Sequence, residues 1–256
     1  MSVAGIAGLF IACRDPVHVR EWYHHHLGLR FSEGEGARFF WREADSGRLA
    51  VSHLDFLDET TSSFHPGTQP FMVRYRVRDL ETLADTLRAG GDDLTIQHGR
   101  GGGIIDPNGQ RVELLEAVEP PGRSVDHGRV QGIGGVFFRS PDPASLKTWY
   151  AKLGIRPGPD GYVTFPASSP DGSETFTAWE VFPSDTTYFD SRGERSPHPF
   201  MLNLRVADLD GFVERLRAAG VWVDPNIESY DYGKFAWIVD PVGARVELWE
   251  PAPTAS

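Results

Sequence analysis

The chain has 256 residues and a mass of 28.4 kDa, with 40% hydrophobic residues, 24% charged residues and a formal net charge of −11. This composition is ordinary for a globular protein, and it excludes disorder over most of the length. The acidic balance argues against a nucleic-acid backbone or an anionic membrane as the principal partner. A single cysteine, Cys13, excludes an internal disulfide and a metal site built from several cysteines.

The N-terminal stretch AGIAGLFIAC, residues 4–13, is similar to the apolar core of a signal peptide. A closely related string, GIGGVFF, occurs again at 132–138, so we expect both segments to be folded structure. No apolar run approaches the roughly 20 residues that span a bilayer. Together with the lone cysteine, this favours a cytoplasmic protein.

Three segments of the first part of the chain recur, in the same order, in the second part. The most similar pair, DPNGQRVELLE and DPVGARVELWE, is identical at eight of eleven positions. The sequence therefore predicts a tandem duplication, with domains at 1–118 and 130–251, a linker rich in Pro, Gly and charge at 119–129, and a tail at 252–256. The recurring pairs are 5–28 with 132–154, 70–91 with 199–220, and 106–116 with 240–250.

Each domain is expected to begin with a strand and a helix. At 15–28 and 142–154 an Asp-Pro pair precedes a segment that carries Trp-Tyr and ends in Leu-Gly. This is the usual order of an N-cap, a proline in the first turn and a glycine after the last turn. Short strands are then predicted at 38–43 and 48–54 in the first domain, and at 161–165 and 175–182 in the second.

A second strand and helix follow in each domain, after the connections 56–69 and 183–198, which are long enough to form lids. Residues 200–206 alternate with a period of two, so Met201, Asn203 and Arg205 share one face. Asp208 suits an N-cap, and an apolar stripe predicts a helix over 209–219. The same pattern holds at 71–91, and further strands are predicted before each domain ends. The repeating unit is βαβββ, four times over.

These patterns resemble the vicinal oxygen chelate superfamily, which includes glyoxalases, bleomycin-resistance proteins and extradiol dioxygenases. The resemblance rests on Asp-Pro…Trp-Tyr…Leu-Gly at 15–28 and 142–154, on DPxGxxxE at 106–113 and 240–247, and on the paired βαβββ order. It covers nearly the whole chain. It implies an α+β fold in which four βαβββ modules form two tandem vicinal oxygen chelate domains, with half-barrel sheets, outer helices and a ligand cleft inside.

One face of each strand is expected to meet the helices, and the other face to line the cleft. The predicted cleft face combines Arg and Asn with aromatic residues, which is typical of a site for a polar or anionic small molecule. The alternative is a solvated outer face with ordinary salt bridges. In the second domain the hairpin segment 228–237 adds further rings. The residues predicted to bind a substrate are Arg74, Arg76, Phe137, Arg139, Asn203, Arg205, Tyr232, Trp237 and Trp249.

The resemblance implies metal ligands, as His, Glu or Gln, on the first, fourth, fifth and last strands of a domain. Two of these four positions in each domain hold glycine or methionine, which are poor ligands for a hard or borderline divalent cation. The positions are Gly8 and Gly135 on the first strand, about His53 and Glu180 on the fourth, Met72 and Met201 on the fifth, and Glu113 and Glu247 on the last.

We therefore expect no metal and no other cofactor. Glu113, Glu247, His53 and Glu180 are predicted as catalytic acid/base groups. The alternative for the two glutamates is an inherited strand position that is now paired with an arginine.

Two classes of function stay open. The favoured one is a metal-independent lyase, isomerase or cyclase of specialised metabolism that acts on a small polar organic molecule. The alternative is a non-catalytic protein that binds an antibiotic and confers resistance, and a metal-dependent dioxygenase is less favoured because ligands are missing. The expected partner is a small molecule, with no nucleic acid and no membrane, and the chain is expected to be a monomer that imitates a dimer or a homodimer. The clefts can form within each domain, or between domains by pairing 1–60 with 199–251 and 130–190 with 70–116.

Overall fold

The computed structural model describes residues 3–252, except 93, 98–100, 118–124 and 160. Residues 119–124 of the predicted linker and 253–256 of the predicted tail lie outside the described residues. None of the described helices is both long and apolar enough to cross a membrane.

The first domain consists of two strand–helix–strand modules. Asp15 and Asp79 cap the two helices, because their side chains accept hydrogen bonds from the backbone N–H groups of His18 and Thr82. In chain order the elements are β1 (Val3–Cys13), α1 (Pro16–Leu27), β2 (Phe31–Ser32), β3 (Gly36–Glu43), β4 (Leu49–Asp58), the 3₁₀ turn η1 (Ser62–Phe64), β5 (Phe71–Val77), α2 (Leu80–Ala89), β6 (Thr95–Gln97), β7 (Gly101–Ile105) and β8 (Arg111–Glu116).

The second domain repeats this order, with two strands rather than three described after its first helix. Asp142 and Asp208 are again the helix caps, as the sequence predicts for Asp208. The elements are β9 (Val130–Ser140), α3 (Pro143–Lys152), β10 (Val163–Ser168), β11 (Glu174–Pro183), β12 (Phe200–Val206), α4 (Leu209–Ala218), β13 (Glu228–Tyr230), β14 (Gly233–Val239) and β15 (Arg245–Pro251).

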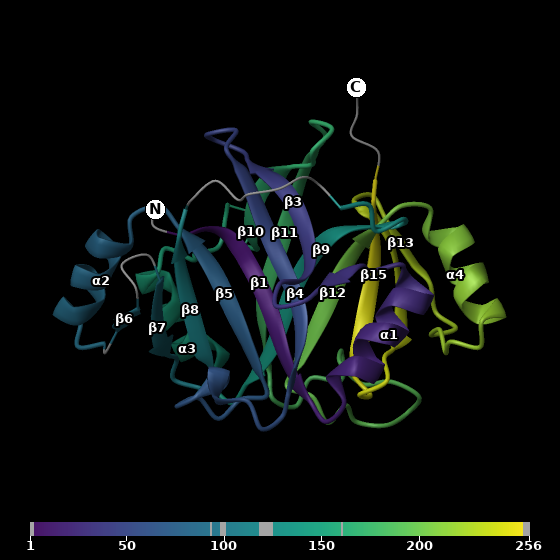
Figure 1. Ribbon diagram of the computed structural model, residues 1–256, viewed down its shortest axis with the longest axis horizontal. Coiled ribbons are helices and arrows are strands. Elements are labelled where there is room, and N and C mark those ends of the chain that lie inside the picture. The colour runs from purple at the N-terminus through teal and green to yellow at the C-terminus, as the bar shows by residue number, and fades with distance from the viewer. Residues whose placement is uncertain (1–2, 93, 98–100, 118–124, 160, 253–256) are drawn as a thin grey trace.

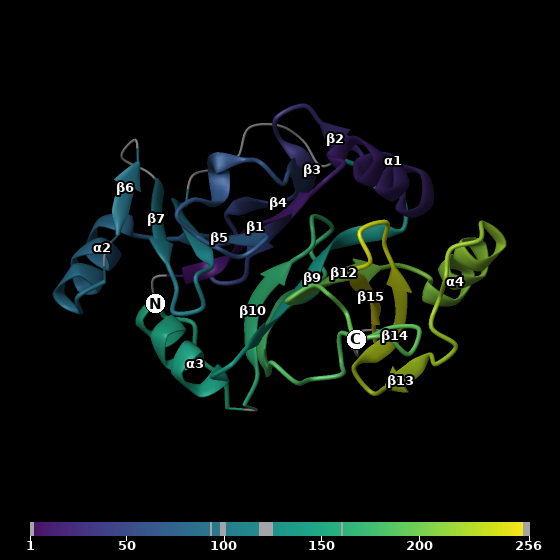
Figure 2. The same cartoon turned by 90° about the horizontal axis from the view of Figure 1, so that it is seen from below.

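Each domain builds its own curved sheet from its two modules. The first strands of the modules lie side by side and antiparallel, β1 with β5 and β9 with β12, and each is flanked by a parallel partner from its own module. The two sheets meet edge to edge where β10 pairs with β3 over two residues, so the described strands form one continuous sheet. Figures 1 and 2 show the two curved sheets packed against each other. The α+β fold expected from the sequence is confirmed.

The two sheets share one apolar core. Residues from all four modules, among them Phe71, Tyr75, Phe138 and Trp179, are fully buried in it. The indole Nε1 of Trp179 donates a 2.7 Å hydrogen bond to Tyr75 Oη, which joins the domains inside this core. The face of each sheet that carries the apolar stripe is therefore used to join the domains, and the opposite face is left for a cleft.

The first helix of each domain packs on its own sheet and also contacts the other domain through a tyrosine. Figure 2 shows α1 on the side of α4, and α3 on the side of α2. Tyr23 of α1 donates a 3.0 Å hydrogen bond to Asp240, and Tyr150 of α3 donates one of the same length to Asp106. Burial raises the pKa of both aspartates, that of Asp240 to about 6. The tyrosine of each Trp-Tyr motif thus bonds the aspartate that begins the DPxGxxxE motif of the other domain, and these two contacts join the domains reciprocally.

Candidate functional site

The register of the strands aligns one residue from each of four neighbouring strands across the open face of each sheet. Directly paired residues on adjacent strands point to the same face. Each row ends at the glutamate predicted on the last strand of the domain. The rows are His53, Gly8, Arg74 and Glu113 in the first domain, and Ala178, Gly135, Asn203 and Glu247 in the second.

This register corrects two expectations. Glu180 pairs with Phe137, whereas His53 pairs with Gly8, so Glu180 and His53 lie two residues apart and are not equivalent. The residue equivalent to Glu180 is Asp55, which pairs with Phe10. On the fifth strand the residues beside Glu113 and Glu247 are Arg74 and Asn203, not the two methionines. Met72 and Met201 lie one row away, where they pair with Phe10 and Phe137. Motif alignment alone could not fix a register to within two residues.

The second domain contains a cavity of about 440 Å³ on the open face of its sheet. All its lining residues come from this domain, so this cleft forms within a domain rather than between domains. The lining is dominated by aromatic rings, which come from β9, β11, β14, β15, the 183–198 connection and the positions just before β10 and β14. The lining residues are Gly134, Phe137, Tyr162, Val163, Thr164, Phe176, Ala178, Trp179, Glu180, Phe182, Tyr188, Asn203, Tyr232, Phe235, Glu247 and Trp249.

Glu247 is the buried carboxylate of this aromatic pocket, and it is 2% exposed. Its Oε1 accepts a 2.5 Å hydrogen bond from Asn203 Nδ2, and its Oε2 accepts one of 2.8 Å from Trp237 Nε1. The hydroxyl of Tyr188 also donates to Oε2. Burial raises the pKa of Glu247, although these three hydrogen bonds oppose the shift. The carboxylate is therefore held rigidly by neutral donors.

Two stacked ring pairs wall the pocket. Phe235 stacks on Trp249 with centroids 6.2 Å apart, and Phe182 stacks on Tyr188 with centroids 5.3 Å apart. Tyr232 extends this wall to the surface, where it is 56% exposed and stacks on Tyr230. A flat apolar molecule would find ring faces on several sides of this cavity.

Glu180 and its equivalent Asp55 are both held by a helix cation. Lys147 of α3 forms an ion pair with Glu180, and Arg20 of α1 forms one of 2.8 Å with Asp55. The next backbone N–H, that of Val181 or of Phe56, donates to the same carboxylate oxygen. The charge of Glu180 is therefore paired with that of Lys147.

The equivalent face of the first domain holds an arginine beside its glutamate. Arg74 Nε donates a 2.7 Å hydrogen bond to Glu113 Oε2, and the guanidinium lies 4.5 Å from the ring centroid of Phe10. His53, in the same row, donates a 2.8 Å hydrogen bond from Nδ1 to the carbonyl oxygen of Glu35, and burial lowers its pKa. Glu113 is thus paired with an arginine, which is the alternative to a catalytic acid/base role for this residue.

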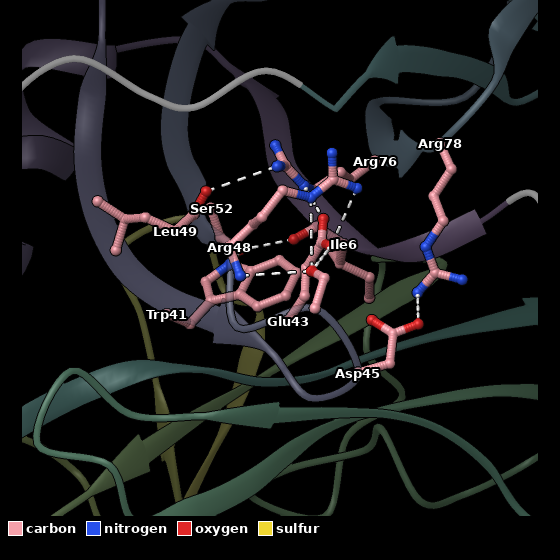
Figure 3. A network of polar contacts seen from close by, with 10 residues as sticks. Ile6, Trp41, Glu43, Asp45, Arg48, Leu49, Ser52, Arg76 and Arg78 are labelled. Atoms are coloured by element: carbon pink, nitrogen blue, oxygen red, sulfur yellow. Dashed lines mark hydrogen bonds and ion pairs between the residues drawn. The ribbon is translucent and has the colours of Figure 1, made fainter.

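The other predicted arginines lie away from the aromatic pocket. Arg76 is buried in an ion pair with Glu43 near the β10–β3 junction, in the polar network of Figure 3. Arg139 pairs with Asp190 at 2.7 Å, and Arg205 donates to a threonine while burial lowers its pKa to about 10. Trp237 is 2% exposed and does not line the pocket, but its indole donates a hydrogen bond to Glu247. The predicted residues that line the pocket are Phe137, Glu180, Asn203, Tyr232, Glu247 and Trp249.

Sequence reasoning missed Tyr188 and Lys147. Tyr188 lies in the 183–198 connection, which was predicted only as a lid, and its hydroxyl reaches Glu247 from outside the sheet. The Tyr-Phe pair in an otherwise polar connection was the one available signal. Lys147 gave no signal, because its contact with Glu180 depends on how α3 packs against β11.

Comparison with known proteins places the chain in a family. A family profile described as the Glyoxalase/Bleomycin resistance protein/Dioxygenase superfamily matches residues 5–248. The chain belongs to this superfamily. No match was found among curated protein sequences.

Several solved structures share the fold of the chain at low sequence identity. A crystal structure of catechol 2,3-dioxygenase matches with a TM-score of 0.64 and 16% identity, over 100% of this chain and 92% of the other. Homoprotocatechuate 2,3-dioxygenase from Arthrobacter globiformis gives 0.64 and 16%, over 97% and 80%. The Mn(II)-bound glyoxalase from Novosphingobium aromaticivorans gives 0.63 and 15%, over 98% and 83%.

The side chains of this chain do not fit a divalent metal such as the Mn(II) of that glyoxalase. In the row of the second domain only Glu247 is an anionic ligand, and its oxygens already accept hydrogen bonds from three side chains. In the first domain an arginine occupies the place beside Glu113. Among the described residues, no three His, Cys, Asp or Glu side chains converge on one point. A divalent cation usually needs three such protein ligands.

Proposed function

We propose that the aromatic pocket of the second domain binds a small organic molecule that has an aromatic ring. The observation that supports this proposal is a cavity of about 440 Å³ walled by stacked rings around one buried carboxylate. Ligand pockets of small-molecule proteins typically have volumes of about 300–1,000 Å³ and a few fixed polar groups in an apolar lining.

The test is a ligand screen of aromatic compounds followed by tryptophan fluorescence, since Trp249 lines the cavity and Trp237 donates a hydrogen bond to its buried carboxylate. A binding compound is then compared between two tyrosine variants. Tyr232→Ala removes a ring that lines the pocket, and we expect weaker binding by about tenfold. Tyr230→Ala removes its equally exposed stacking partner outside the pocket and is the matched control. Equal effects of the two substitutions would contradict the assigned site.

A second function, metal-independent acid–base catalysis, is favoured by the Glu247–Tyr188 pair. A buried carboxyl with a raised pKa in hydrogen-bond contact with a phenol has the features of a proton-transfer site. In such a lyase or isomerase Glu247 would hold the proton and Tyr188 would orient the carboxylate.

Tyr188→Phe separates the two functions, because it removes only the hydroxyl and keeps the ring. Catalysis predicts a fall in turnover of about 10²-fold with little change in binding. Pure binding predicts no turnover in either protein and an affinity within about threefold. Tyr162→Phe, at another ring of the same lining, is the matched control.

A further inference from the structure

The two domains of this chain provide an internal comparison for the site. Phe137, Asn203 and Glu247 of the second domain occupy the strand positions that Phe10, Arg74 and Glu113 occupy in the first. In the first domain a guanidinium fills the space between the ring and the carboxylate. In the second domain the shorter asparagine leaves that space to the cavity.

The carboxylate of the second domain has no cation of its own. Among the described residues Glu247 forms no ion pair, and its three hydrogen-bond donors are neutral side chains. The nearby cations pair with other carboxylates: Arg245, whose charge favours the ionised form of Glu247 without touching it, pairs with Asp224 at 3.0 Å, and Lys147 pairs with Glu180. A buried carboxylate without a cation in direct contact is unfavourable, and a cation brought by a ligand would supply that contact.

The rest of the lining also suits a cation. The faces of Phe, Tyr and Trp rings attract ammonium and guanidinium groups, most strongly in sites that exclude water. Asn203 is 3% exposed, and its Oδ1 has no hydrogen-bond partner, so it can accept from an N–H group. Gly134 is required beside this oxygen, because a Cβ there would lie 2.1 Å from it.

We infer that the aromatic pocket takes an organic cation, such as a protonated amine carried on an aromatic body, with the positive group in the place that Arg74 takes in the first domain. This inference rests on the ligand-binding function proposed above. It names the charge of the ligand, which that proposal leaves open. It differs from the sequence-based expectation of an anionic or polar ligand, because the arginines behind that expectation lie outside the pocket.

The test compares three probes of similar size and different charge: 2-phenylethylammonium, 2-phenylethanol and 3-phenylpropanoate. Titrations follow the indole ¹H–¹⁵N resonances of Trp237 and Trp249. We expect the cation to bind at least about tenfold more tightly than the alcohol, and the anion most weakly. An alcohol or an anion that binds as tightly as the cation overturns the inference and leaves the binding function standing. If no probe shifts these resonances, the proposed function fails as well.

Substitutions locate the source of the preference. Glu247→Gln keeps the volume and removes the charge, so we expect the preference for the cation over the alcohol to fall below about threefold. Glu214→Gln, on the exposed face of α4, is the matched control and should keep it. Asn203→Arg supplies the guanidinium of the first domain and should abolish binding of the cation. If both Glu247→Gln and Asn203→Arg keep the preference for the cation over the alcohol, the inference is overturned. If the arginine variant does not fold, the preference measured for Glu247→Gln alone decides whether the inference stands.

Discussion

Substitution of Asp240 by Asn is expected to change how the stability of the chain depends on pH. Burial between the domains raises the pKa of this carboxyl from its ordinary value of 3.8 to about 6. Between those values the folded protein binds a proton that the unfolded chain does not, so the free energy of unfolding falls as pH rises through the folded pKa. A shift of about 2 units corresponds to about 3 kcal/mol in all, at 1.36 kcal/mol per unit.

The assay is urea unfolding of both proteins at several pH values from about 4.5 to 7.5. Asparagine keeps an oxygen for the N–H groups of Val242 and Ala244, which bond Asp240 Oδ1, and it does not ionise. Over this pH range the free energy of unfolding of the native protein, minus that of the variant, should decrease by about 2 kcal/mol. Asp231→Asn, at an exposed loop position, is the control and should show no such trend. A difference that stays constant with pH would refute the assignment of a proton-binding aspartate at the domain interface.

Three further substitutions test the packing around the site and between the domains. Gly134→Ala should weaken binding of 2-phenylethylammonium and destabilise the fold by about 1–3 kcal/mol, because its methyl group would overlap Asn203 Oδ1; unchanged binding in a titration would contradict this. Trp179→Phe removes the 2.7 Å hydrogen bond to Tyr75 and should cost about 1–3 kcal/mol in urea unfolding, whereas a neutral effect would deny its role. Glu43→Gln breaks a buried ion pair and should destabilise the chain by about 3–5 kcal/mol, and a midpoint that does not move would show that the pair adds nothing.

The architecture could be predicted from the sequence because it depends on repeated local patterns. The helix starts at Asp15 and Asp142 and the period-two alternation of 200–206 need no knowledge of distant contacts. The family resemblance then implied half-barrel sheets with outer helices and a cleft inside, which local patterns do not contain. The reciprocal contacts of Tyr23 and Tyr150 were out of reach, since they join residues 217 and 44 positions apart.

The candidate site was predictable only in part, and the reason is register and side-chain reach. Period two placed Phe137, Asn203 and Glu247 on the correct face of their strands. It could not show that Arg205 is buried away from the cavity, because a long side chain can leave the face on which it starts. Nor could it show that Tyr188 reaches Glu247, because that contact depends on the path of a connection between strands.

The measurement that tests the account most directly is a crystal structure of the chain with 2-phenylethylammonium. The account predicts one molecule in the cavity of the second domain, with its ring among Phe137, Phe235 and Trp249 and its ammonium group within about 4 Å of a Glu247 oxygen. A probe bound at Arg74 and Glu113 of the first domain, or a divalent ion coordinated by Glu247, would contradict it.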